Sequence, residues 1–229
     1  ILMKVSISQV GEVISFNLSP EKSDIDHIQT SNIRLAENVT RINLQGIDVE
    51  DIHPDFIGLA TILICHPFVG KELILPVKVS KFFFDEVNKV LSKYKIISEI
   101  DERITPYKPP IRSRPGLAFS GGADSSAALS VMPGNTVPIF MNRPMKRWSM
   151  YDSDAPLSNC KLLREIGYDV QIIDCDVEYL RKPVGFPSDL AHAIPSILLS
   201  EVLGLDSIAF GTVLESAYGI GHEKFKNYP

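Results

Sequence analysis

The chain has 229 residues, 45% hydrophobic content and a formal net charge of −5, which suit one large globular domain or two modest ones and argue against a general polyanion binder. Three cysteines are too few for a disulfide framework or a zinc ribbon, so we expect a reducing, cytoplasmic location. The longest apolar stretch, residues 56–65, falls well short of the roughly 20 residues that span a bilayer, which predicts no membrane association.

The first part of the chain predicts a strand-rich α+β domain over residues 1–112. Polar and apolar residues alternate over 4–10 and 12–18, on either side of Gly11, which indicates a β-hairpin. Further strands are expected at 33–35, 39–44 and 72–79. Pro54 opens a predicted helix over 55–65, and an apolar stripe from Phe82 to Leu91 has helical spacing.

A segment rich in proline and basic residues, 104–115, marks the predicted domain boundary. Beyond it, over 113–229, strands expected at 116–119, 136–141, 170–174 and 207–211 alternate with helices expected at 125–132, 155–166 and 188–203. This alternation predicts an α/β fold, a parallel sheet with helices on both faces. Pro195 should kink the last helix near Ala191. The sequence leaves open whether this domain continues past Pro229.

A glycine-rich turn directly follows the first strand of this second region. Its glycines let the backbone approach an anion, and the unpaired amides of the next helix point toward it. The serine hydroxyls add donors, and Asp124 can cap the helix or hold a magnesium ion. The predicted phosphate-binding residues are Phe119, Ser120, Gly121, Gly122, Ala123, Asp124, Ser125 and Ser126. Because parallel strands place ligands beyond their carboxyl ends, Ser120, Asn142, Asp174, Gly211 and Thr212 should converge on one crevice.

The Ser-Gly-Gly-x-Asp-Ser pattern at residues 120–125 resembles the signature of the PP-loop ATP pyrophosphatases, and the wider arrangement is most similar to the 7-cyano-7-deazaguanine synthases. The resemblance implies cleavage of ATP to AMP and pyrophosphate, with Mg²⁺, to adenylate a small molecule that ammonia or another nucleophile then attacks. It implies catalytic roles for Ser120, Asp124 and Ser125. It also implies adenosine contacts from Met141 and Asn142, a nucleotide contact from Gly211 and Thr212, and metal ligation by Asp124 and Glu215.

Two features depart from those synthases: the chain lacks their zinc-binding cysteine cluster, and it begins with an extra domain. We therefore expect a divergent ligase whose substrate is set by the amino-terminal domain. Arg143, Arg147 and Glu215 are candidate substrate contacts. Cys160 and Cys175 are interpreted as structural, and His192 as packed or surface-lying.

Two other functions stay open from the sequence. A tRNA-modifying enzyme would use one continuous basic track, and a non-catalytic sensor would use ATP only to order the tail that begins at Gly211. The residues of the predicted track are Lys108, Arg112, Arg114, Arg143, Lys146 and Arg147. A homodimer is also left open.

Overall fold

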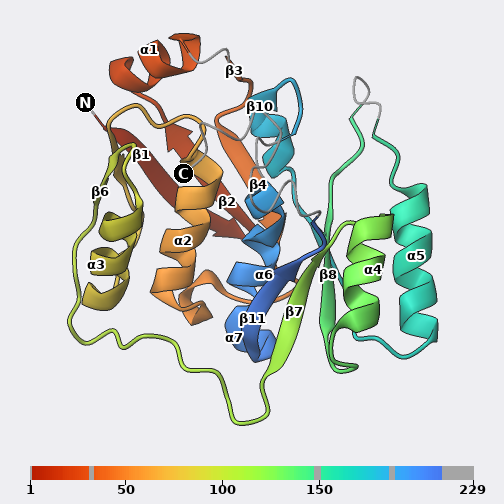
Figure 1. The fold of residues 1–229 in the computed structure, drawn as a ribbon. Coiled ribbons are helices and arrows are strands. Elements are labelled where there is room, and N and C mark those ends of the chain that lie inside the picture. The colour runs from red at the N-terminus through yellow and green to blue at the C-terminus, as the bar shows by residue number, and fades with distance from the viewer. Residues whose placement is uncertain (1, 31–33, 147–150, 186–188, 213–229) are drawn as a thin grey trace.

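The computed structural model describes residues 2–30, 34–146, 151–185 and 189–212. The described residues form two larger sheets flanked by helices and a small two-stranded sheet, a mixed α/β architecture (Figure 1). The first is a five-stranded mixed sheet of order β4-β2-β1-β5-β6, and the second is a four-stranded parallel sheet of order β11-β7-β8-β9.

The predicted hairpin is confirmed as β1 (Met3–Val10) and β2 (Val13–Ser19), which pair antiparallel. Gly11 makes the turn at φ +57°, a left-handed conformation that glycine adopts without strain. The strand expected at 39–44 is β4 (Val39–Asn43), which pairs with β2. The short strand β3 (Arg34–Leu35) does not join this sheet, because it pairs with β10 (Arg181–Lys182) of the second region.

The strand expected over 72–79 is shorter than predicted. β5 (Glu72–Ile74) ends before Pro76, which has no amide hydrogen to donate to a ladder. β5 pairs with β6 (Lys95–Ile97), an edge strand too short to show a pattern in the sequence. The predicted helices are confirmed as α2 (Pro54–Cys65) and α3 (Lys81–Val90), whereas α1 (Lys22–Thr30) was not predicted.

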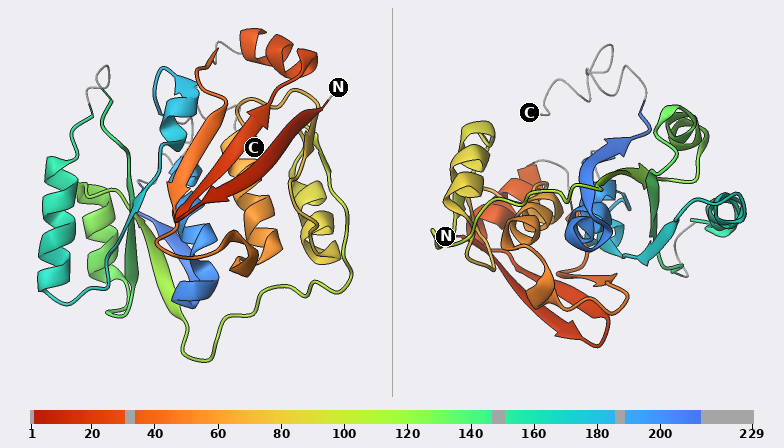
Figure 2. Two further views of the ribbon diagram at one scale, coloured as in Figure 1. Left: turned by 180° about the vertical axis from the view of Figure 1, so that it is seen from behind. Right: turned by 90° about the horizontal axis from the view of Figure 1, so that it is seen from below.

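The second region alternates strand and helix as predicted, with β7 (Arg114–Phe119), α4 (Ala123–Val131), β8 (Val137–Asn142), α5 (Asp154–Glu165), β9 (Gln171–Asp174) and β11 (Leu205–Phe210). Helices cover both faces of this sheet. Leu117, Phe119 and Phe140 face α4 and α5, and the opposite face packs against α6 (Ile194–Leu198). Figure 2 shows α4 and α5 together on the outer side of the sheet.

The prediction of a single helix over 188–203 is wrong. The segment folds as a 3₁₀ helix, η3 (Asp189–Ala193), followed by α6 and by α7 (Ser200–Leu203). Pro195 does not kink a continuous helix, since it occupies the first turn of α6, where its missing amide hydrogen has no intrahelical acceptor to lose. Gly204, at φ +61°, ends α7 in a left-handed conformation, and β11 follows at once.

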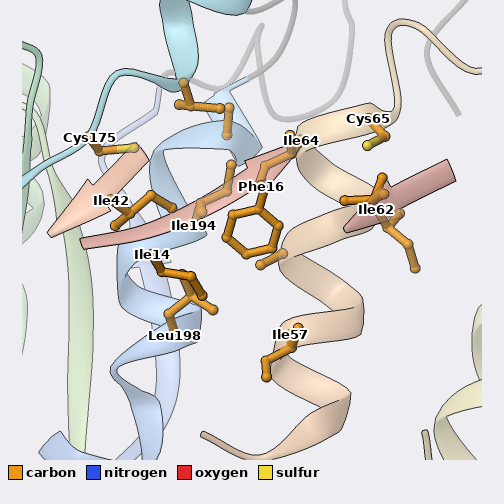
Figure 3. Packing of buried hydrophobic residues seen from close by; sticks show 14 of the residues in the cluster. Ile14, Phe16, Ile42, Ile57, Ile62, Ile64, Cys65, Cys175, Ile194 and Leu198 are labelled. Atoms are coloured by element: carbon orange, nitrogen blue, oxygen red, sulfur yellow. The ribbon is translucent and has the colours of Figure 1, made fainter. Parts of the chain in front are cut away.

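One hydrophobic core extends across the predicted boundary at residues 112/113. Figure 3 shows Phe16 of β2 close to α2 and to Ile194 and Leu198 of α6, and all these side chains belong to one buried cluster. The edge strand β4 also meets the second region, because Ile42 forms an isolated bridge with Cys175, directly after β9.

A buried carboxylate reinforces this junction. Asp176 accepts hydrogen bonds from the Thr40 hydroxyl at 2.8 Å and from the Arg41 amide at 2.6 Å. The two regions therefore pack against each other through an apolar core and a paired polar group. The connecting segment around residue 107 follows the lower end of both regions in Figure 1, where the Tyr107 ring packs on Phe56 at a centroid distance of 5.0 Å.

Candidate functional site

The glycine-rich turn lies at the carboxyl end of β7, a central strand of the four-stranded sheet. The neighbouring strands β8 and β11 run parallel to β7, so Ser120 and Gly211, which follow their strands, and Asn142, the last residue of β8, lie at the same edge. Asp174, the last residue of β9, lies at this edge as well, because β9 is parallel to β8. The topology brings together the strand ends that the sequence predicts at one site.

Hydrogen bonds within the turn hold Ser120, Gly122 and Ser125 together. The Ser120 and Ser125 hydroxyl oxygens are 3.0 Å apart, and the Gly122 amide donates to the Ser120 hydroxyl at 3.3 Å. Asn159 of α5 donates from its amide to the Gly121 carbonyl oxygen at 2.8 Å. The turn is thus fixed both by its own serines and by the neighbouring helix.

The three serines of the turn differ in what they can contact. Ser125 is 1% exposed and its hydroxyl donates to the Gly122 carbonyl oxygen, so it holds the turn in shape. The Ser126 hydroxyl donates to the same oxygen at 2.9 Å. Ser120 and Ser126 are both exposed residues, whereas Ser125 is not. The predicted catalytic role of Ser125 stays a prediction, and its geometry favours a positioning role.

Asp124 lies in the first turn of α4 and is exposed. It does not cap the helix, because Gly122 occupies the N-cap position and no side chain makes a capping hydrogen bond there. The first amide that reaches an intrahelical acceptor is that of Ser126, which donates to the Gly122 carbonyl oxygen. The amides of the exposed residues Ala123 and Asp124 therefore have no intrahelical acceptor and carry the positive end of the helix dipole.

Two glycines of the site are required by close packing within the protein. A β-carbon at Gly211 would lie 2.3 Å from the Ser125 α-carbon, and one at Gly121 would lie 2.7 Å from the Pro156 α-carbon. Gly121 also has φ +75°. The backbone after β11 is therefore in contact with the first turn of α4.

Gly122 is in a different situation. Its φ is −89°, and the nearest atom to an added β-carbon would be the Ser120 hydroxyl oxygen at 3.4 Å. No steric contact in the described protein requires a glycine here, although the N-cap position favours glycine over alanine. A phosphate oxygen approaching the Ala123 amide would also need the space that a side chain would fill. The turn offers amide and hydroxyl donors together with one carboxylate, Asp124, a donor set that fits a phosphate chain carrying a divalent cation.

The end of β8 extends beyond the end of β7. The last pair of the β7–β8 ladder is Phe119 with Phe140, so Met141 and Asn142 continue past the strand that carries the turn. Met141 is 6% exposed and its side chain belongs to the core, which leaves only its backbone for a ligand. The Asn142 side chain donates to the Asp174 carboxylate at 2.6 Å.

The substrate candidate Arg143 is already paired within the protein. Its guanidinium donates to the Glu178 carboxylate at 3.0 Å and lies 4.1 Å from the centre of the Tyr151 ring. Lys146 forms an ion pair with Glu37, a residue of the first region. The first region therefore reaches the carboxyl edge of the second sheet.

The predicted basic residues do not form one track. Arg114 lies at the start of β7 and pairs with Asp169 at 2.8 Å, and Lys108 and Arg112 precede it in the connecting segment. Arg143 and Lys146 follow β8 at the opposite edge of the sheet, about one strand length or 17 Å away. Arg147 and Glu215 lie outside the described residues, and Thr212, the last described residue, is exposed directly after Gly211.

Several residues near this edge have contacts that no pattern in the sequence indicates. Glu178 lies in the 3₁₀ helix η2 (Val177–Leu180), pairs with Arg143, and has His192 of η3 at 3.8 Å from its other carboxylate oxygen. Asn159, which holds the turn, is one residue before Cys160 on α5. These contacts join segments far apart in the chain, so no local pattern reports them.

All three cysteines of the chain are buried and free. Burial raises the pKa of the Cys160 thiol to about 11 and raises the pKa values of Cys65 and Cys175 further. The interpretation of Cys160 and Cys175 as structural agrees with this burial, since reactive thiols are accessible and have lowered pKa values.

Within the described ranges, no helix is long and apolar enough to cross a membrane, and no group of three or more His, Cys, Asp or Glu side chains is arranged to hold a metal ion. Comparisons of the chain with models of known protein families, with curated proteins and with solved structures found no match.

Proposed function

We propose that the chain binds ATP at the turn between β7 and α4 and cleaves it between the α and β phosphates, as PP-loop ATP pyrophosphatases do. The single observation that carries the proposal is the open turn itself. The exposed residues Ser120, Ala123 and Asp124 and the sterically unrestricted Gly122 meet at the carboxyl end of a central parallel strand, where the first amides of α4 have no intrahelical acceptor.

The neighbouring strand ends suit the rest of the nucleotide. Backbone groups of Met141 and Asn142 continue past the β7 ladder, where an adenine could hydrogen-bond to them. Gly211, which precedes Thr212, approaches the first turn of α4 from the other side. The ends of β8 and β11 therefore lie on either side of the turn. A bound nucleotide would need such flanking groups, because its adenosine extends beyond the phosphates held by the turn.

The chain's residues would act mainly by positioning and by electrostatics. The Ala123 and Asp124 amides and the Ser120 hydroxyl would hold the β and γ phosphates and stabilise the charge that pyrophosphate gains as it leaves. Asp124 would hold Mg²⁺, which supplies charge neutralisation at the phosphate oxygens. Ser125 and Asn159 would keep the turn in shape, and no covalent nucleophile of the protein is needed.

We infer that the molecule adenylated is small, with an oxygen that attacks the α phosphate. Arg143 and Lys146 are each paired with a carboxylate, and the predicted basic residues separate onto opposite edges of the sheet, so a phosphate backbone finds no continuous track. A tRNA substrate is therefore less well supported than a metabolite.

The experiment measures both binding and products on the full chain. ATP with Mg²⁺ is titrated calorimetrically, and the protein is then incubated with ATP and a metabolite extract while AMP, ADP, phosphate and pyrophosphate are quantified. AMP and pyrophosphate in equal amounts are expected. ADP with phosphate would contradict the proposal, and ATP binding without any cleavage would favour the sensor.

Matched variants test the residues. Asp124→Asn should leave the fold intact and lower pyrophosphate release about 100-fold, because the cation loses its carboxylate. Its control is Glu201→Gln, an exposed acid in the first turn of α7, at the opposite edge of the sheet. Ser120→Ala should weaken ATP binding roughly fivefold, since one hydrogen bond is lost. Ser130→Ala, an exposed serine near the end of α4, should have no effect.

A further inference from the structure

Asp174, a carboxylate at the carboxyl edge of the second sheet, is held by one neighbour and is open to solvent. It is the last residue of β9 and is exposed, and its Oδ1 accepts a hydrogen bond from the Asn142 side chain at 2.6 Å. Among the described residues, no other hydrogen-bond donor reaches this carboxylate. An ionised carboxylate accepts on both oxygens, so in this part of the chain Oδ2 stays available while the bond from Asn142 fixes its orientation.

The acid two residues later shows how a structural carboxylate is held at this edge. Asp176 is buried, accepts hydrogen bonds from Thr40 and from the Arg41 amide, and has the Arg41 guanidinium at 3.6 Å. Asp174 has neither burial nor, among the described residues, an ion pair. Packing therefore explains the carboxylate of Asp176 and does not explain that of Asp174.

The Asp174 side chain lies on the face of the sheet where α4 begins. Phe119 and Phe140 both belong to the apolar cluster under α4 and α5. Side chains alternate along a strand, so Asn142, two residues after Phe140, points to that same face, whereas Met141 between them belongs to the other core. Asp174 shares the face with Asn142, because the two residues pair in the ladder and their side chains are hydrogen-bonded.

The register of the strands places Asp174 level with the nucleotide turn and to one side of it. Phe119 pairs with Phe140, and Asn142 pairs with Asp174, so the carboxylate is two residues beyond the end of the β7 ladder. Neighbouring strands are about 4.8 Å apart, so β9 lies roughly 10 Å from β7. In ATP, a ribose and the α phosphate separate the adenine from the β phosphate, which is a similar span. A nucleotide whose phosphates occupy the turn can therefore bring its base to Asp174.

The chemistry of this carboxylate distinguishes adenine from other purines. Adenine carries an amino group at C6, which donates hydrogen bonds, whereas guanine and hypoxanthine carry a carbonyl oxygen there. An ionised carboxylate only accepts hydrogen bonds, so it attracts the amino group and repels the carbonyl oxygen. We propose that Asp174 selects adenine at the nucleotide site by accepting a hydrogen bond from the adenine amino group on Oδ2. Selection of adenine rests on the proposed function, because it requires the phosphates to lie in the turn.

The test compares three nucleotides, each titrated with Mg²⁺ into the full chain by calorimetry. They are ATP, inosine triphosphate, which has the carbonyl oxygen, and purine riboside triphosphate, which lacks the amino group. The wild-type chain should bind ATP about tenfold more tightly than either analogue, the effect of one hydrogen bond to a charged group. In Asp174→Asn the preference for ATP over inosine triphosphate should disappear, because an amide donates to a carbonyl oxygen as readily as it accepts from an amino group.

The matched control is Asp169→Asn, the same substitution at an exposed acid just before β9, at the opposite edge of the sheet. It should keep the wild-type preference. Each preference is a ratio of two affinities of one protein, so a general structural loss in a variant lowers both affinities and leaves their ratio unchanged.

Selection by Asp174 is ruled out if the wild-type chain binds purine riboside triphosphate as tightly as ATP. This result needs no variant, so it holds even if Asp174→Asn does not fold. Selection by Asp174 is also ruled out if Asp174→Asn keeps the preference that Asp169→Asn shows. ATP binding without any preference for the base contradicts the selection of adenine alone, whereas binding of none of the three nucleotides contradicts the proposed function as well.

Discussion

Replacing Gly211 by alanine should both destabilise the protein and weaken nucleotide binding. The added β-carbon would lie 2.3 Å from the Ser125 α-carbon, 2.5 Å from the Ser125 amide nitrogen and 2.7 Å from the Asp124 carbonyl carbon. All three are backbone atoms, which cannot rotate away as the end of a side chain can. Either the end of β11 or the first turn of α4 must move.

Two opposing effects set the size of the loss. Alanine restricts the unfolded chain more than glycine does, which stabilises a protein by about 0.4–1 kcal/mol where the site accepts the methyl group. Overpacking against fixed atoms costs about 1–3 kcal/mol. We expect the clash to dominate, with a net loss of about 1–2 kcal/mol in the free energy of unfolding.

Urea denaturation followed by circular dichroism measures this loss, and calorimetric titration of ATP measures binding. Gly134→Ala is the matched control, because an added β-carbon there meets nothing within 4 Å. It should leave both quantities nearly unchanged. Equal stability and equal ATP affinity of the Gly211 and Gly134 variants would refute the reasoning, since the contact between β11 and α4 would then carry no energy.

Three further predictions concern other parts of the molecule. Burial lowers the pKa of His66 to about 4 from 6.5, so below pH 6.5 the unfolded chain takes up a proton that the folded chain does not. The free energy of unfolding should therefore fall as the pH is lowered from 6.5 to 4, and it should fall less steeply in His66→Phe. At pH 8 a thiol reagent should modify none of the three buried cysteines in the native protein and all three in urea, and fast native labelling would contradict their burial. Asp176→Ala should cost about 2 kcal/mol, because it leaves Thr40 and the Arg41 amide unpaired, whereas the exposed Glu201→Ala should change stability by less than about 0.5 kcal/mol.

The strands and helices around the turn could be predicted because their signals are local. Phe119 ends an apolar run, Ser120 and two glycines follow, and small residues begin the helix. The signals for the strand, the turn and the helix therefore all lie within one short segment. The same holds for the hairpin around Gly11. Alternation of such segments then predicts a parallel sheet, and the sheet in turn predicts which strand ends meet.

Elements held by distant partners could not be predicted in this way. β3 and β10 are two residues long each and exist only because they pair with one another across the chain. Pro195 indicates a break in a helix, but the sequence alone does not decide between a kink and a new helical start. At the carboxyl edge, the ion pairs of Arg143 with Glu178 and of Lys146 with Glu37 likewise depend on which loops the fold brings together.

Gly121, Gly122 and Gly211 of the site differ in whether the packing of the protein explains why they are glycines. Gly121 and Gly211 are explained by the protein, since Pro156 and the first turn of α4 occupy the space that a side chain would need. Their presence is therefore no evidence for a nucleotide. Gly122 has an ordinary φ, and an added β-carbon would make only an ordinary contact with the Ser120 hydroxyl oxygen at 3.4 Å, so packing does not exclude alanine, and the only preference of the fold for glycine is that of an N-cap position. If Gly122→Ala folds, with no more than the loss of about 1 kcal/mol expected at an N-cap, yet loses ATP binding, the space beside this residue belongs to the ligand. If Gly122→Ala binds ATP normally, the phosphate chain does not approach the turn at this residue. The open turn then no longer supports the proposal of ATP cleavage.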